Sequence, residues 1–131
     1  MKRFLVPLSV LFALSACGPA IDGKWSTIEL PAGSNWTVKY TFEFRGTTLN
    51  VGATCTKGTG YNAVEYDSEG QGPIKFVEGA FVVPETIEVR GYFDECDFDL
   101  KSSTYGYLLS RDGSTLTVFI EGPSDLTFYR D

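Results

Sequence analysis

Val38-Lys39-Tyr40-Thr41-Phe42-Glu43-Phe44-Arg45 is the most regular segment of the chain, because apolar and polar side chains alternate along it without a break. One face of the segment carries Val38, Tyr40, Phe42 and Phe44, and the other face carries only polar or charged side chains. Alternation with a period of two is the pattern of a strand that has one buried and one solvated face. The segment therefore predicts a β-strand with its aromatic face toward a core.

The same alternation continues on both sides of this strand. Gly46-Thr47 predicts a turn, after which Leu49, Val51 and further alternate residues to position 55 face inward. Asp112-Gly113 predicts a hairpin between strands at 107–109 and 116–120. Residues 67–73, which are polar and rich in glycine, predict a loop. Other predicted strands lie at 61–66, at 74–83 with a bend at 78–79, at 87–93, at 96–100 with the pattern continuing at 105–109, and at 126–130.

The spacing of these segments indicates the fold class. No stretch of ten or more residues shows the 3.6-residue period of a helix, and about eight or nine strands recur at intervals near ten residues. A sandwich and a barrel both suit this number of strands. A barrel is favoured, because closure removes exposed strand edges. We expect an all-β domain over residues 23–131, a single small antiparallel up-and-down β-barrel of about eight strands.

Residues 1–16 have the features of a secretory signal peptide. Met1-Lys2-Arg3 is basic, residues 4–13 form an apolar run, and small residues follow. The run is shorter than the roughly 20 residues that a membrane-spanning helix needs. Cleavage after Ala16 by an ordinary signal peptidase is one interpretation of this segment.

Leu14-Ser15-Ala16-Cys17 resembles the lipobox of bacterial lipoproteins. The resemblance implies that Cys17 becomes the first residue of the mature protein and carries the lipid, with residues 17–22 as a short tether. It also implies a lipid-anchored protein of the bacterial cell envelope. Gly18 after the cysteine points to the outer membrane, with the domain facing the periplasm.

The charge of the mature chain assigns the membrane contact to the lipid. The full chain has a formal charge of −6, and loss of Lys2 and Arg3 with the signal leaves −8. An anionic bilayer repels such a body, so the N-terminal lipid is expected to make the contact. The same charge argues against nucleic acid as a partner.

The cysteines support this interpretation. The chain has three cysteines, and if Cys17 carries the lipid, Cys55 and Cys96 remain as one pair. In an oxidising compartment they form a disulfide worth about 4 kcal/mol in the chain-entropy model. A metal site or catalytic thiol is the alternative, although the chain has no histidine and no C-x-x-C spacing.

Gly23-Lys24-Trp25, at the start of the first predicted strand, resembles the signature of the lipocalins and related calycins. In that family the tryptophan plugs one end of the barrel and a basic residue from near the barrel's end packs over it. The resemblance implies that Trp25 and Arg130 form this pair. In size the mature domain is similar to the small lipocalin-like lipoproteins of bacteria.

The composition also bears on the chemistry. Histidine is absent, which removes the usual histidine-based nucleophile systems and proton shuttles, so we expect no enzyme and no cofactor. Residues 94–99 hold four acids. Their spacing matches no Ca²⁺ loop, so they predict a solvated acidic face and no metal site.

Two functions remain open for a monomeric domain of this kind. Aromatic residues, 15% of the chain, either fill the barrel or line a cavity for a small apolar or amphipathic ligand. The candidate contact residues are Trp36, Tyr40, Phe42 and Phe44, with Trp36 either in a loop or at the start of a strand. The alternative is a protein-interaction module, such as a periplasmic inhibitor of a lysozyme or protease. An interior cavity larger than about 300 Å³ would favour the carrier, and a filled barrel the interaction module.

Overall fold

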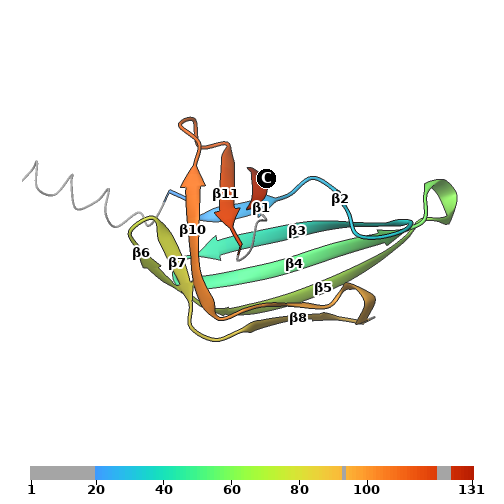
Figure 1. The fold of residues 1–131 in the computed structure, drawn as a ribbon, viewed down its shortest axis with the longest axis horizontal. Coiled ribbons are helices and arrows are strands. Elements are labelled where there is room, and N and C mark those ends of the chain that lie inside the picture. Colours follow the sequence, from blue (N-terminus) through green and yellow to red (C-terminus); the bar gives the residue numbers. More distant parts are fainter. Residues whose placement is uncertain (1–19, 93, 121–124) are drawn as a thin grey trace, which may run out of the picture.

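A computed structural model describes residues 20–92, 94–120 and 125–131 of the chain (Figure 1). The described residues form one antiparallel sheet and two short 3-10 turns. The strands are β1 (Gly23–Ser26), β2 (Leu30–Pro31), β3 (Trp36–Arg45), β4 (Thr48–Lys57), β5 (Val64–Pro73), β6 (Lys75–Val77), β7 (Ala80–Val83), β8 (Ile87–Gly91), β9 (Phe98–Leu100), β10 (Ser103–Leu109), β11 (Thr115–Phe119) and β12 (Asp125–Arg130). The 3-10 turns are η2 (Gly60–Asn62) and η3 (Asp94–Cys96).

The order of the strands across the sheet is β6-β7-β10-β11-β12-β1-β3-β4-β5-β8-β9, with β2 beside β3. The sheet is curled into a half-barrel, which confirms the all-β class and the barrel type of curvature (Figure 1). The predicted number of strands was wrong, because the described residues form twelve and not about eight. Ile74 separates β5 from β6, residues 84–86 separate β7 from β8, and residues 101–102 separate β9 from β10.

The curl differs between the two halves of the molecule. Strand β6 stands at one end of the sheet order, yet only Ile74 separates it from β5, and the Ile74 N–H donates to the Thr47 carbonyl at 2.8 Å. The edge strand β6 is thus continuous with β5, which belongs to the other side of the sheet, so the sheet closes on itself here. We call this part the closed half. Beyond it, β3, β4 and β5 run on as long strands and form a trough, the open half (Figure 1).

The closed half is filled by side chains. Its core joins sixteen buried residues, of which the largest are Trp25, Phe42, Phe44, Phe81 and Phe128. The rings of Phe42 and Phe128 lie 4.6 Å apart between centroids, and those of Phe44 and Phe81 lie 5.3 Å apart. Aromatic pairs at these distances are packed against one another. The aromatic face predicted from the alternation in β3 thus lies in the core.

The loop predicted at residues 67–73 was wrong, because these residues belong to the long strand β5. Their glycines serve close packing. A Cβ on Gly70 would overlap the carbonyl of Glu88, and one on Gly72 would lie 2.9 Å from the Ile87 side chain. Strand β8 therefore lies closely against β5, and glycine is the residue that leaves the necessary space.

Candidate functional site

Trp25 and Arg130 lie together at the end of the closed half. They face each other in the register of β1 and β12, and the Arg130 guanidinium carbon is 4.1 Å from the Trp25 ring centroid. Arg130 also donates hydrogen bonds to the carbonyls of Gly113, Asp22 and Ala20. Trp25 is fully buried, and its indole N–H donates to the Ile21 carbonyl at 2.9 Å. The pair seals this end of the core and ties the N-terminal segment to the last strand.

The four candidate contact residues on β3 divide between the two halves. Phe42 and Phe44 are 2% and 0% exposed, so they belong to the packed core of the closed half. Tyr40 is half-buried, its ring lies 5.2 Å from that of Phe98, and burial raises the pKa of its hydroxyl. Trp36 begins β3 and is also only partly buried. Tyr40 and Trp36 thus belong to the open half.

Trp36 borders a small cleft in the trough. The cleft has a volume of about 260 Å³ and is lined by Ala32, Trp36, Cys55 and Glu95. The Trp36 ring lies 5.7 Å from the Tyr66 ring, and the Lys57 ammonium lies 5.6 Å from the Trp36 ring centroid. The indole is therefore held between an aromatic ring and a cation, with part of its surface exposed.

The Cys55–Cys96 disulfide confirms the pairing predicted from the cysteine count. It joins β4 to η3 and lies in a small apolar cluster with Val38 and Ala53. Beside it, the Asp97 carboxylate accepts hydrogen bonds from the Ser68 hydroxyl and the Gly91 N–H, both at 2.9 Å. These contacts fix η3, and with it Glu95, against the trough.

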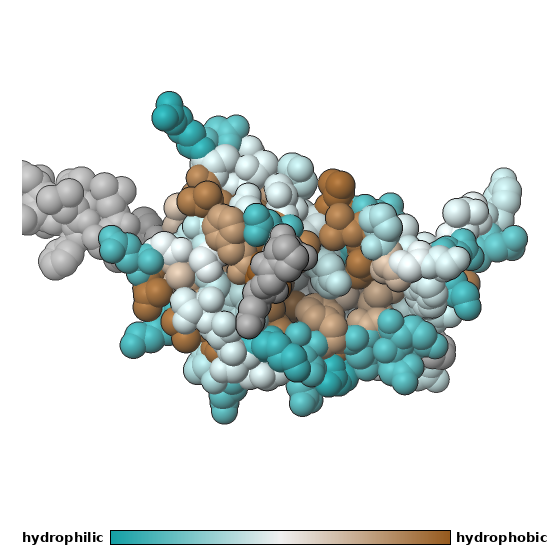
Figure 2. Space-filling model, viewed as in Figure 1, coloured by the Kyte–Doolittle hydropathy of each residue, from teal (hydrophilic) through white to brown (hydrophobic). Residues whose placement is uncertain are grey.

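Exposed apolar and acidic side chains surround the trough. The segments around it carry Ile28, Tyr61, Val64 and Tyr92, which are 47% to 106% exposed. Asp94 and Glu95 of η3 are the acids at the cleft, whereas Glu29 accepts a hydrogen bond from Thr37 on the outer face of β3. Figure 2 shows apolar side chains in the hollow and hydrophilic ones along its lower margin. Large aromatic groups are enriched at protein interfaces, and polar groups form the rims of such interfaces.

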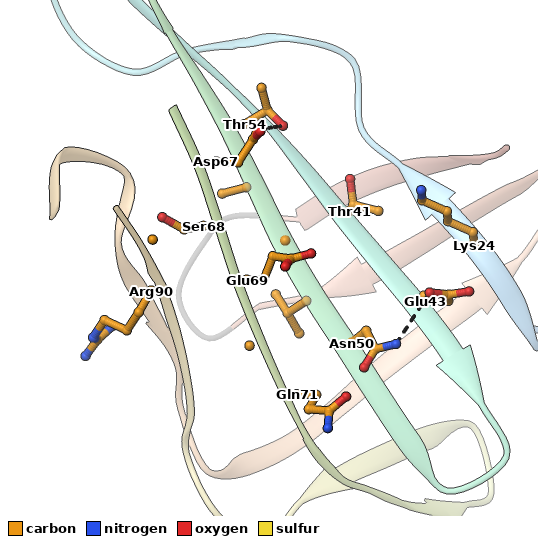
Figure 3. A pocket seen from close by; sticks show the side chains of 15 residues that line it. Lys24, Thr41, Glu43, Asn50, Thr54, Asp67, Ser68, Glu69, Gln71 and Arg90 are labelled. Carbon is orange, nitrogen blue, oxygen red and sulfur yellow. Dashed lines mark hydrogen bonds between the residues drawn. The ribbon is translucent and has the colours of Figure 1, made fainter. Parts of the chain in front are cut away.

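A groove of about 700 Å³ lies on the outer surface of β3, β4 and β5 (Figure 3). It is polar, with Lys24, Thr41, Asn50 and Glu69 around it, and Gly52 leaves its floor bare. A hydrogen bond from Arg45 lowers the pKa of Glu43 at its edge. Sequence reasoning missed this groove. The sequence signal for the groove is Gly52, a glycine inside the otherwise regular strand β4.

Two of the four acids of residues 94–99, Asp97 and Asp99, bond to different partners. Asp97 is held by Ser68 and Gly91, whereas Asp99 pairs with Arg90 at 2.9 Å. Over the described ranges, no group of three or more cysteine or acidic side chains is arranged to hold a metal ion.

No family model, no curated protein and no solved structure matches this chain. Within the described residues, no helix has the length and apolar character needed to cross a bilayer. Residues 1–16 and Cys17 lie outside the described part.

Proposed function

We propose that this chain is a lipid-anchored envelope protein that binds another protein through its open half. One observation carries the proposal: the closed half is packed with aromatic rings, whereas partly exposed aromatic groups gather around the trough. A filled interior leaves no space for the ligand of a carrier. The open half therefore replaces the barrel interior as the site of binding.

We further infer that the half-barrel is an interrupted lipocalin-like barrel with up-and-down topology. Residues 75–77 pair with 80–82, and residues 68–69 pair with 90–91, so β6–β7 and β5–β8 extend one ladder. The pairs β7–β10 and β8–β9 extend a second ladder in the same way. Joining the interrupted strands, and setting β2 aside, gives eight long strands, and the β1–β12 pair brings the last beside the first.

The trough has the properties of a protein-binding surface. Binding energy in protein interfaces comes mainly from a few large side chains, with tryptophan and tyrosine prominent among them. Trp36 and Tyr61 are such groups here, and Trp36 adjoins a cleft that a partner side chain can enter. The disulfide and the hydrogen bonds of Asp97 hold this surface in place before binding, which reduces the entropic cost.

The chemistry of the surface selects a basic partner. Asp94 and Glu95 beside the cleft and the net negative charge of the chain attract a positively charged protein and accelerate its association at low ionic strength. A lysozyme or a basic protease reaching the periplasm is a partner of this class, and the protein would act on it as an inhibitor.

A photocrosslinking amino acid at position 61 tests the proposal in intact cells. We expect illumination to yield a discrete adduct with one protein, and Trp36→Ala to reduce that adduct at least fivefold. The same probe at Thr117, on the outer surface of β11, is the control and should yield no such adduct. Absence of an adduct at position 61, or an adduct that Trp36→Ala leaves unchanged, would overturn the proposal.

A further inference from the structure

The outer surface of β7, β10 and β11 carries no charged side chain of its own, and Lys75 of β6 and Asp125 of β12 border it, opposite Val82 and Phe119 respectively. Along β7, β10 and β11, the residues that alternate with the buried positions point outward, and Gly106 lies opposite Ala80 while Leu108 lies opposite Thr117. We call these residues the uncharged face: Val82, Thr104, Gly106, Leu108, Thr115, Thr117 and Phe119. By contrast, the groove side, which is the outer surface of β3, β4 and β5, is lined by charged side chains of both signs: Lys24, Glu43, Asp67, Glu69 and Arg90.

The uncharged face is also apolar over much of its area. Leu108 is 64% exposed and Phe119 is 38% exposed. The neighbouring strands add Val77 and Tyr129, which are 43% and 45% exposed. Gly106 leaves room for the Phe119 ring, which would lie 3.4 Å from a Cβ at that position. A group of exposed apolar side chains with charges only at its borders marks a surface that contacts something other than water.

The N-terminal tether leaves the domain beside this face. Arg130 donates to the Ala20 carbonyl and also to the carbonyl of Gly113, in the turn between β10 and β11. Cys17 precedes Ala20 by three residues. Three residues span at most about 11 Å, so a lipid on Cys17 stays close to this turn.

We infer that the uncharged face rests on the bilayer surface when Cys17 carries its lipid; this rests on the lipid anchor of the proposed function. The short tether keeps the domain at the membrane at a high effective concentration, so weak contacts suffice to orient it. Contact of the groove side with the bilayer would take its acids and its cations, among them Glu69 and Arg90, out of water, whereas the uncharged face has no charged group to desolvate. Leu108, Phe119 and Tyr129 then contact the headgroup region, and the groove side faces away.

Depth-dependent quenching tests this orientation in the full-length lipoprotein. Thr117→Cys and Thr54→Cys place an environment-sensitive fluorophore on the uncharged face and on the groove side, respectively. Each protein is reconstituted in vesicles of phosphatidylethanolamine and phosphatidylglycerol that contain a spin-labelled lipid. We expect the probe at position 117 to be quenched at least threefold more than the probe at position 54. Leu108→Glu should reduce that difference.

Two results would overturn the inference, and each is distinct from failure of the anchor. The mass of the N-terminal peptide reports whether Cys17 is acylated, so quenching is interpreted on acylated protein. Equal quenching of the two probes in acylated protein would show that no face is preferred. Burial of the probe at position 117 that disappears as the protein is diluted in the membrane would assign the face to a second copy of the chain.

Discussion

Arg130 connects the N-terminal segment, the last strand and the β10–β11 turn at the closed end. Its guanidinium covers Trp25 and bonds to three carbonyls from the N-terminal segment and the β10–β11 turn. We expect Arg130→Ala to lower the free energy of unfolding by about 1–3 kcal/mol, because the cation–π contact and several hydrogen bonds are lost together.

Arg45→Ala is the matched control for this variant. Arg45 pairs only with Glu43, on the solvent-exposed side of β3, and exposed pairs of this kind contribute little. Urea denaturation of both variants measures the difference. Equal midpoints for Arg130→Ala and Arg45→Ala would show that the Trp25–Arg130 contact does not hold the closed end.

Asp112 gives the β10–β11 turn a pH dependence. Hydrogen bonds from Ser110 and Ser114 lower its pKa from 3.8 to about 2. Because the folded-state pKa is the lower one, the turn gains stability from Asp112 above pH 3.8 and loses it as the pH falls toward 2. NMR titration of the carboxyl carbon should give a midpoint near 2, and Asp112→Asn should remove this part of the acid dependence. A midpoint near 3.8 would contradict the hydrogen-bonded turn.

Sequence reasoning placed some residues well, for identifiable reasons. The disulfide followed from cysteine parity, and the inward positions of Phe42 and Phe44 followed from alternation. Alternation predicts that a side chain points inward, but it does not predict whether that side chain fills the core or lines a cavity. The choice between core and ligand contact depended on aromatic packing from other strands, which no local pattern contains.

At the scale of the elements, the breaks in the strands were the hardest feature to predict. Pro84 marks the break between β7 and β8 in the sequence, whereas Ile74 itself gives no such signal at the boundary between β5 and β6. Residues 67–73 show the opposite error, since their composition is that of a loop and tertiary packing makes them a strand. A glycine can indicate either a turn or a place where two strands pack closely. Which of the two applies depends on whether a neighbouring strand lies against it.

Gly70 tests the close contact between β5 and β8. A Cβ at this position would overlap the Glu88 carbonyl, so we expect Gly70→Ala to destabilise the fold by about 2–3 kcal/mol. Gly52→Ala is the control, because its Cβ would lie 3.6 Å from the nearest atom, an ordinary contact. Thermal denaturation of the two variants should therefore separate them, and equal melting temperatures would contradict the packing described.

The disulfide should stabilise the open half selectively. It closes a loop between positions 41 residues apart, and its reduction should cost up to about 4 kcal/mol. Hydrogen exchange is expected to accelerate in η3 and at the end of β4, with the closed half still protected. Uniform acceleration over the whole sheet would show that the two halves do not respond separately.

At the scale of the whole molecule, the chain combines three different regions on one curled sheet. The closed half is a packed core, the open half presents aromatic and acidic groups, and the outer surface is charged on one side and uncharged on the other. The all-β class was predictable because strand periodicity is local. The division into two halves was not, because it depends on which strands meet across the sheet.

Native mass spectrometry of the protein from an envelope extract tests the central claim, that the interior is filled and binding occurs elsewhere. The account predicts a mass that consists of the polypeptide, its Cys17 lipid and one disulfide, with no further small molecule. A reproducible additional mass of a few hundred daltons that leaves on denaturation would contradict it and would make the protein a carrier.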